Sequence, residues 1–106
     1  MDLHCGDIYY ADLIQVDRKL GGIRPVLIIH SVEDTVTVAA ITTNRASQRL
    51  ETDIDVYSES CDLANGSVAL MGQLWQINRN QLKGKLGEAD RCVIDIVNDI
   101  ARRTFN

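Results

Sequence analysis

The chain has 106 residues, of which 45% are apolar and 25% charged; this favours one folded domain over residues 1–106 and excludes a disordered chain. Its net charge of −4 argues against non-specific nucleic-acid binding, which depends on neutralising phosphates. No apolar run is long enough to span a membrane and the N-terminus lacks the features of a signal peptide, so we expect a cytoplasmic protein without membrane contact.

β-Strand patterns fill most of the chain before residue 88. Apolar or alternating runs bounded by turn residues predict strands over 7–13, 25–30, 35–42, 52–56 and 67–74, with a short edge strand over 82–86. Glu33 and Asp34 form a short turn between the second and third strands, which predicts a hairpin. Within 52–56 we expect Ile54 and Val56 to point inward and the acids outward, and Gly72 marks a bulge or a close approach of two segments.

From Glu88 onward the apolar spacing becomes helical. The predicted stripe consists of Ala89, Cys92, Val93, Ile96, Val97, Ile100 and Ala101. Acids near the start and Arg102 and Arg103 near the end suit the helix dipole. We expect Cys92 to be a buried filler and Ile94, off the stripe, to be available to a partner. Several short strands followed by one C-terminal helix predict a mainly β (α+β) fold built on a small, strongly bent sheet or barrel.

Arg24 lies in the most informative segment, Gly21-Gly22-Ile23-Arg24-Pro25-Val26-Leu27-Ile28-Ile29. Pro25 is the chain's only proline, and it fixes Arg24 in an extended conformation at the start of an apolar strand. Two interpretations are open. Arg24 either pairs with a surface carboxylate or offers its fork of donors to an anionic ligand.

The cysteines and histidines do not form a metal-binding pattern. The three cysteines are an odd number, widely separated and without a C-x-x-C pair, which also argues against a disulfide framework. His4 and His30 are far apart, and for His30 we favour a satisfied strand-end side chain over a ligand or a base. We therefore expect no metal and no cofactor.

Four segments in order carry a resemblance to a known family: Gly6-Asp7-Ile8-Tyr9 with Asp12-Leu13, the glycine–arginine–proline segment above, Val38-Ala39-Ala40-Ile41-Thr42, and Ser67-Val68-Ala69-Leu70 through Gln73 to Ile77. Over nearly its whole length the chain resembles the MazF/PemK (Kid) toxins of bacterial type II toxin–antitoxin modules. The resemblance implies an SH3-like small barrel with short helices and a C-terminal α-helix, the CcdB/PemK-like toxin fold, assembled as a homodimer.

The resemblance also implies a function. It implies a metal-independent, sequence-specific endoribonuclease that cleaves single-stranded mRNA through attack by the 2′-OH. The products are a 2′,3′-cyclic phosphate and a 5′-OH, and the consequence is inhibited translation and growth. A cognate antitoxin is expected to cover the RNA groove with an acidic, partly disordered tail.

Arg24 and Thr42 match the catalytic arginine and threonine of the family, and the hairpin is expected to bring them to one sheet edge. Both are donors that can stabilise charge developing on the phosphate. For RNA binding we predict Arg18, Lys19, Thr43, Asn44, Arg45, Gln48, Arg49, Gln73 and Trp75, because cations contact phosphate and amides read unstacked bases. Each of these is equally compatible with an ordinary surface residue, and for Trp75 we favour a core or interface position over base stacking.

Two departures from the family concern proton transfer. Around Gln73 many members carry an acid and an arginine, where this chain has Gly72 and Trp75. This leaves the general acid and base unassigned, and it keeps open a degenerate member that binds antitoxin but cleaves RNA weakly or not at all. A CcdB-like gyrase inhibitor is the remaining alternative. The last five residues, 102–106, argue against it because they lack the tryptophan typical of that branch.

Overall fold

A computed structural model describes residues 3–13, 22–43, 52–63 and 66–105. The elements are β1 (Asp7–Asp12), β2 (Ile23–Val32), β3 (Thr35–Thr42), β4 (Asp53–Asp55), β5 (Val68–Leu70), β6 (Trp75–Asn78), the 3₁₀ helix η1 (Arg79–Gln81), β7 (Leu82–Glu88) and α1 (Arg91–Phe105). Within this part of the chain, α1 has neither the length nor the hydropathy of a membrane-crossing helix.

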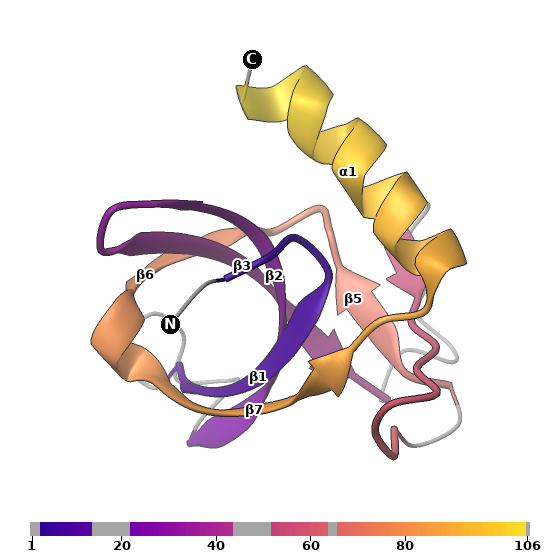
Figure 1. The fold of residues 1–106 in the computed structure, drawn as a ribbon, viewed down its shortest axis with the longest axis horizontal. Helices are drawn as coiled ribbons and strands as arrows, with labels where there is room; N and C mark the ends of the chain where they lie inside the picture. Colours follow the sequence, from indigo (N-terminus) through magenta and orange to yellow (C-terminus); the bar gives the residue numbers. More distant parts are fainter. Residues whose placement is uncertain (1–2, 14–21, 44–51, 64–65, 106) are drawn as a thin grey trace.

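The strands form one antiparallel sheet that curls into a small barrel with α1 outside it (Figure 1). On the side away from β2, strand β3 pairs with two different strands. Its first half pairs with β6, and its last two residues pair with β5. Strand β7 pairs with β1 on the other side of the sheet, and η1 joins it to β6. This arrangement confirms the expected mainly β architecture.

The central strands are apolar on both faces because each face covers a separate core. Ile8, Leu27 and Ile29 belong to the cluster beneath α1, together with Val93 and Val97. The alternate residues of the same strands form a second cluster, whose buried members are Tyr9, Ala11, Leu13, Val26, Ile28, Val36, Val38, Ala40, Val68, Leu70 and Ile77. Adjacent side chains of a strand point to opposite faces, so a strand buried on both sides is a continuous apolar run.

The helix presents a different face to the sheet from the one predicted. Ile94 is partly buried against the first cluster, whereas Ile96 is 50% exposed and Cys92 is exposed. The cause is Gly6, where a Cβ would lie only 2.5 Å from Cγ1 of Ile94. Because Gly6 has no side chain, Ile94 packs directly on its backbone, and the predictions for Ile94, Ile96 and Cys92 are wrong.

Three further predictions need correction. The strand expected over 67–74 ends at Leu70, and a turn leads into β6, which the sequence analysis did not predict. Gly72 lies in this turn, where a Cβ would meet Oγ1 of Thr52 at 2.6 Å, so the expected close approach is confirmed and the bulge is not. Asp53 is buried instead of pointing outward. Helix α1 begins at Arg91, and Glu88 belongs to β7.

Candidate active site

A surface cavity of about 250 Å³ lies where β2, β3 and the segment before β5 meet. It is lined by Arg24, Pro25, Ile41, Thr42, Thr43, Asp62, Leu63 and Ser67. Both residues predicted to be catalytic, Arg24 and Thr42, therefore border the same space. The cavity combines one guanidinium, three hydroxyl groups and one carboxylate.

The hairpin explains why Arg24 and Thr42 meet. Strands β2 and β3 are joined by only two residues, and Val26 pairs with Ala40. Continued for two residues, this register places Arg24 opposite Thr42. On the other side of β3, Thr42 pairs with Val68, which brings the neighbouring Ser67 to the cavity. The turn fixes the register at the hairpin tip, and a register shift between Ile28 and His30 sets the register at the far end, so the juxtaposition of Arg24 and Thr42 depends on both.

Within the described part of the chain, Arg24 is not held by an ion pair with another residue. It is half-buried, and its buried Nε has no hydrogen-bond acceptor among the residues that the structure describes. Over the same residues, no carboxylate forms an ion pair with it. A buried donor without a partner costs about 1–3 kcal/mol. That cost favours the second interpretation of Arg24, a guanidinium kept available for an anionic ligand.

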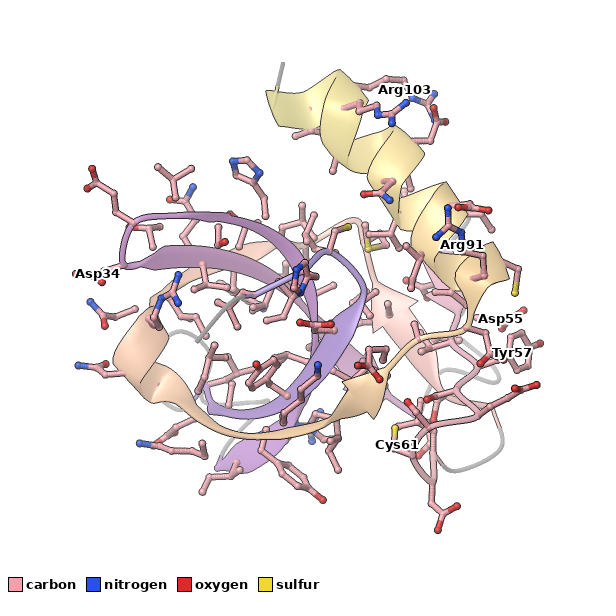
Figure 2. The ribbon with its side chains drawn as sticks, in the orientation of Figure 1. Asp34, Asp55, Tyr57, Cys61, Arg91 and Arg103 are labelled. Carbon is pink, nitrogen blue, oxygen red and sulfur yellow. The ribbon has the colours of Figure 1, made fainter. Side chains whose placement is uncertain are left out.

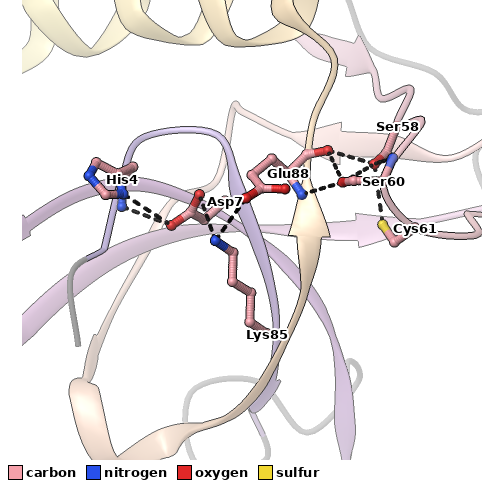
Figure 3. Close-up of polar contacts among 7 residues, drawn as sticks. All are labelled: His4, Asp7, Ser58, Ser60, Cys61, Lys85 and Glu88. Atoms are coloured by element: carbon pink, nitrogen blue, oxygen red, sulfur yellow. Dashed lines mark hydrogen bonds and ion pairs between the residues drawn. The ribbon is translucent and has the colours of Figure 1, made fainter.

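Asp62 and Leu63 complete the cavity, and side-chain hydrogen bonds of the residues just before them hold this segment against β7 (Figure 3). Ser58 and Ser60 donate from Oγ to the carbonyl oxygen of Glu88, and the Glu88 N–H donates to Oγ of Ser60 at 2.8 Å. Close approach requires Gly87, where a Cβ would lie 2.6 Å from Oγ of Ser60. We call the Ser58 and Ser60 contacts with Glu88 the serine clamp.

Ionic contacts continue from the serine clamp along β7 (Figure 3). Lys85 Nζ lies 2.9 Å from Oε1 of Glu88 and 3.7 Å from Oδ1 of the buried Asp7. The hydrogen bond with Glu88 raises the pKa of Lys85, and the same bond is the main cause that lowers the pKa of Glu88. The pair is exposed, so its contribution to folding is small and is screened by salt.

This pair predicts a pH-dependent effect of Glu88→Gln. Because the pKa of Glu88 is lower in the folded state, its carboxylate stabilises the fold at pH values above its unfolded pKa of about 4.3, and this stabilisation is lost as the pH falls through the folded pKa. Because the pKa of Lys85 is higher in the folded state, its ammonium group stabilises the fold at pH values below its unfolded pKa of about 10.4, and this stabilisation is lost at higher pH. We therefore expect Glu88→Gln to lower the urea midpoint at pH 7 in low salt and to lower it less at pH 3. An equal loss at both pH values would contradict the assignment.

The other predicted RNA-binding residues differ in their placement. Thr43 lines the cavity. Gln73 is exposed and Trp75 is half-buried against the second cluster, and neither lines the cavity. Arg18, Lys19, Asn44, Arg45, Gln48 and Arg49 lie outside the described residues. Their roles stay predictions. The sequence analysis missed Asp62, Leu63 and Ser67 as cavity residues, since only contacts between distant segments bring them there.

Comparison with known proteins identifies the family. The profile of the PemK-like, MazF-like toxins of type II toxin–antitoxin systems matches residues 4–105. Endoribonuclease EndoA of Bacillus subtilis is 32% identical over 100 residues, covering 89% of this chain and 86% of the relative. Endoribonuclease MazF of Staphylococcus saprophyticus is 38% identical over 87 residues, covering 76% of this chain and 72% of the relative.

A solved structure agrees at the level of the fold. A mycobacterial endoribonuclease in complex with its cognate antitoxin superposes with a TM-score of 0.69 at 19% identity, covering 97% of both chains. The cavity where β2, β3 and the segment before β5 meet therefore belongs to a fold that this enzyme shares. With the profile match and the two relatives above 30% identity, the protein is a member of the PemK-like, MazF-like toxin family of type II toxin–antitoxin systems.

Proposed function

We propose that this toxin is a metal-independent endoribonuclease that cleaves single-stranded mRNA at a short sequence in the cytoplasm and thereby stops translation. The main support for this proposal is the cavity that both Arg24 and Thr42 line, because it offers a permanent cation and a hydroxyl donor to one phosphate. The net charge of −4 does not oppose this proposal, since a single cleavage site requires local positive charge only.

The proposed reaction is an intramolecular transfer within the RNA. The 2′-oxygen attacks the adjacent phosphorus, the bond to the 5′-oxygen breaks, and the products are a 2′,3′-cyclic phosphate and a 5′-OH. Negative charge grows on the phosphate oxygens during attack, and donors aimed at those oxygens lower the barrier. In this proposal Arg24 binds the phosphate through two N–H groups and Thr42 donates its hydroxyl hydrogen to the same group.

A cleavage map on one long transcript tests the proposal. The purified toxin is incubated with RNA in EDTA, and primer extension is used to locate the cuts. We expect cuts at one short sequence, ends that polynucleotide kinase labels without prior phosphatase treatment, and equal cleavage with and without Mg²⁺. Intact RNA in all conditions would refute the proposal. Tight antitoxin binding would then identify a degenerate toxin, and inhibited supercoiling would identify a gyrase inhibitor.

We propose that a cognate antitoxin neutralises the toxin by covering the cavity with an acidic segment. Support comes from the mycobacterial relative, whose structure contains its cognate antitoxin. An acidic side chain can pair with the guanidinium of Arg24, which has no ion pair with another described residue. Binding there would compete directly with the RNA phosphate.

We further propose that the toxin is a homodimer in which the outer face of α1 contacts the second copy. Ile96 is half-exposed beside a groove that also includes Ile54, Met71 and Ile100. Ile96→Glu is expected to convert the dimer to monomer in analytical ultracentrifugation, because it introduces a charge into an apolar contact. Val32→Glu at the hairpin tip, an exposed apolar residue on another face, is the matched control. An unchanged sedimentation coefficient for Ile96→Glu would contradict this interface.

A further inference from the structure

The cavity contains one acidic side chain among its lining residues, Asp62. It comes from the segment between β4 and β5, far along the chain from Arg24, and neither the strand patterns nor the family motifs single it out. Within the described part of the chain, it forms no ion pair with Arg24. A carboxylate and a guanidinium that form no ion pair with another described residue therefore share one cavity.

The position of Asp62 is built into the fold. The preceding residues are fixed by the serine clamp, and the backbone N–H of Glu59 donates to Oδ1 of Asp90 at 2.8 Å. Leu63, the following residue, packs against the first hydrophobic cluster. Contacts on both sides of Asp62 thus hold it at the cavity.

A carboxylate in a phosphate-binding cavity is electrostatically unfavourable unless it takes part in the chemistry. Two like charges in one cavity repel each other, and more strongly near a protein surface than in bulk water. The proposed cleavage requires a group that removes the proton of the 2′-OH. Arg24 cannot do so because its guanidinium stays protonated, and the hydroxyl groups of Thr42 and Ser67 are far weaker bases than a carboxylate.

We propose that Asp62 is the general base of the cleavage reaction, an inference that rests on the proposed ribonuclease function. Its carboxylate accepts the proton of the 2′-OH while the 2′-oxygen bonds to phosphorus. The P–O5′ bond then breaks, and the departing 5′-oxygen takes a proton from water. Asp62 returns its own proton to solvent before the next turnover. This assignment supplies a general base for a chain that has Gly72 where many family members have an acid.

The test separates chemistry from binding. The substrate is a short RNA containing the mapped cut site, and its uncleavable analogue has 2′-deoxyribose at the scissile nucleotide. Single-turnover cleavage is measured for wild type, Asp62→Asn, Asp62→Glu and Asp62→Ala, and binding of the analogue is measured by fluorescence anisotropy. Asp34→Asn at the tip of the β2–β3 hairpin is the matched control, because it removes an exposed carboxylate far from the cavity (Figure 2).

We expect Asp62→Asn to cleave about 10²- to 10⁴-fold more slowly, the usual contribution of general acid–base catalysis. The analogue should bind to this variant at least as tightly as to wild type, because a negative charge beside the phosphate is gone. Asp62→Glu should retain part of the activity, and added formate should accelerate Asp62→Ala in proportion to its concentration.

Three results would overturn the inference. Cleavage by Asp62→Asn within threefold of wild type would exclude Asp62 as the base while leaving the ribonuclease function intact. A loss of cleavage matched by an equal loss of analogue binding would show that Asp62 acts in binding. No cleavage by wild type would overturn the ribonuclease function and this inference together.

Discussion

Arg24→Ala is expected to slow RNA cleavage by about 10²- to 10³-fold, the usual cost of removing one donor that stabilises a developing oxyanion. The variant should fold as well as wild type, since the buried Nε of Arg24 has no hydrogen-bond acceptor among the described residues. Removing a buried donor that lacks a partner relieves a cost in the folded state. Activity and stability should therefore change independently, or in opposite directions.

Two further variants sharpen the test of Arg24. Arg24→Lys keeps the positive charge but cannot donate two parallel N–H bonds to a phosphate. It should therefore cleave RNA faster than Arg24→Ala but more slowly than wild type. Arg91→Ala removes an exposed arginine of α1 that pairs with the exposed Asp95, and it should cleave like wild type (Figure 2). In cells, induced wild type should arrest growth and Arg24→Ala should not. Equal cleavage by wild type and Arg24→Ala would remove Arg24 from the reaction.

Gly6→Ala is expected to destabilise the fold by about 2–5 kcal/mol, combining backbone strain with overpacking. Gly6 has a φ of +94°, which alanine adopts only with strain, and its Cβ would lie 2.5 Å from Cγ1 of Ile94. The residue cannot move aside easily. Its N–H donates to the carbonyl oxygen of Ile28 at 2.8 Å, and its own carbonyl accepts from the N–H of Ala89 at 2.8 Å.

Urea denaturation of four variants, namely Gly6→Ala, Gly84→Ala, Ile94→Ala and the double variant Gly6→Ala/Ile94→Ala, separates backbone strain from overpacking. Gly84→Ala is the matched control because a Cβ there has nothing within 4 Å, so its stability should stay close to wild type. Combining Gly6→Ala with Ile94→Ala should cost less than the sum of the single changes, since the shortened side chain makes room. A Gly6→Ala midpoint equal to that of Gly84→Ala would show that α1 does not press on Gly6.

The hairpin part of the site could be predicted from the sequence because local rules determine it. The alternation of Thr35–Thr42 and the acidic turn at 33–34 predicted β3 with correct bounds and its pairing with β2. A two-residue connection fixes the pairing of Val32 with Thr35 at the hairpin tip. A register shift between Ile28 and His30 then aligns the far end of the hairpin, where Arg24 and Thr42 lie near one another. That both line one cavity agrees with this expectation.

The rest of the site depends on contacts between distant segments. Asp62 lies in an irregular polar segment without periodicity, and hydrogen bonds from Ser58 and Ser60 to Glu88 determine its place. The rotation of α1 was mispredicted for a related reason. Helical spacing in the sequence identifies the apolar stripe of α1. It does not show that Ile94 packs directly on the backbone of Gly6, which has no side chain to keep it away. Strand β6 escaped prediction because the predicted strand over 67–74 was expected to run through Gly72, whereas the chain turns there and begins a new strand at Trp75.

The exposure of Cys92 on α1 makes the native chain suited to site-selective fluorescent labelling. Of the three thiols only Cys92 is exposed; Cys61 is half-buried and donates to Oγ of Ser58. Burial, with a smaller contribution from Asp7, raises the pKa of Cys5 and so depletes its reactive thiolate. One equivalent of a maleimide dye at neutral pH will therefore label Cys92, which lies one helical turn before Ile96. The fluorescence of this label can report contact of that face of α1 with a second copy without an engineered cysteine.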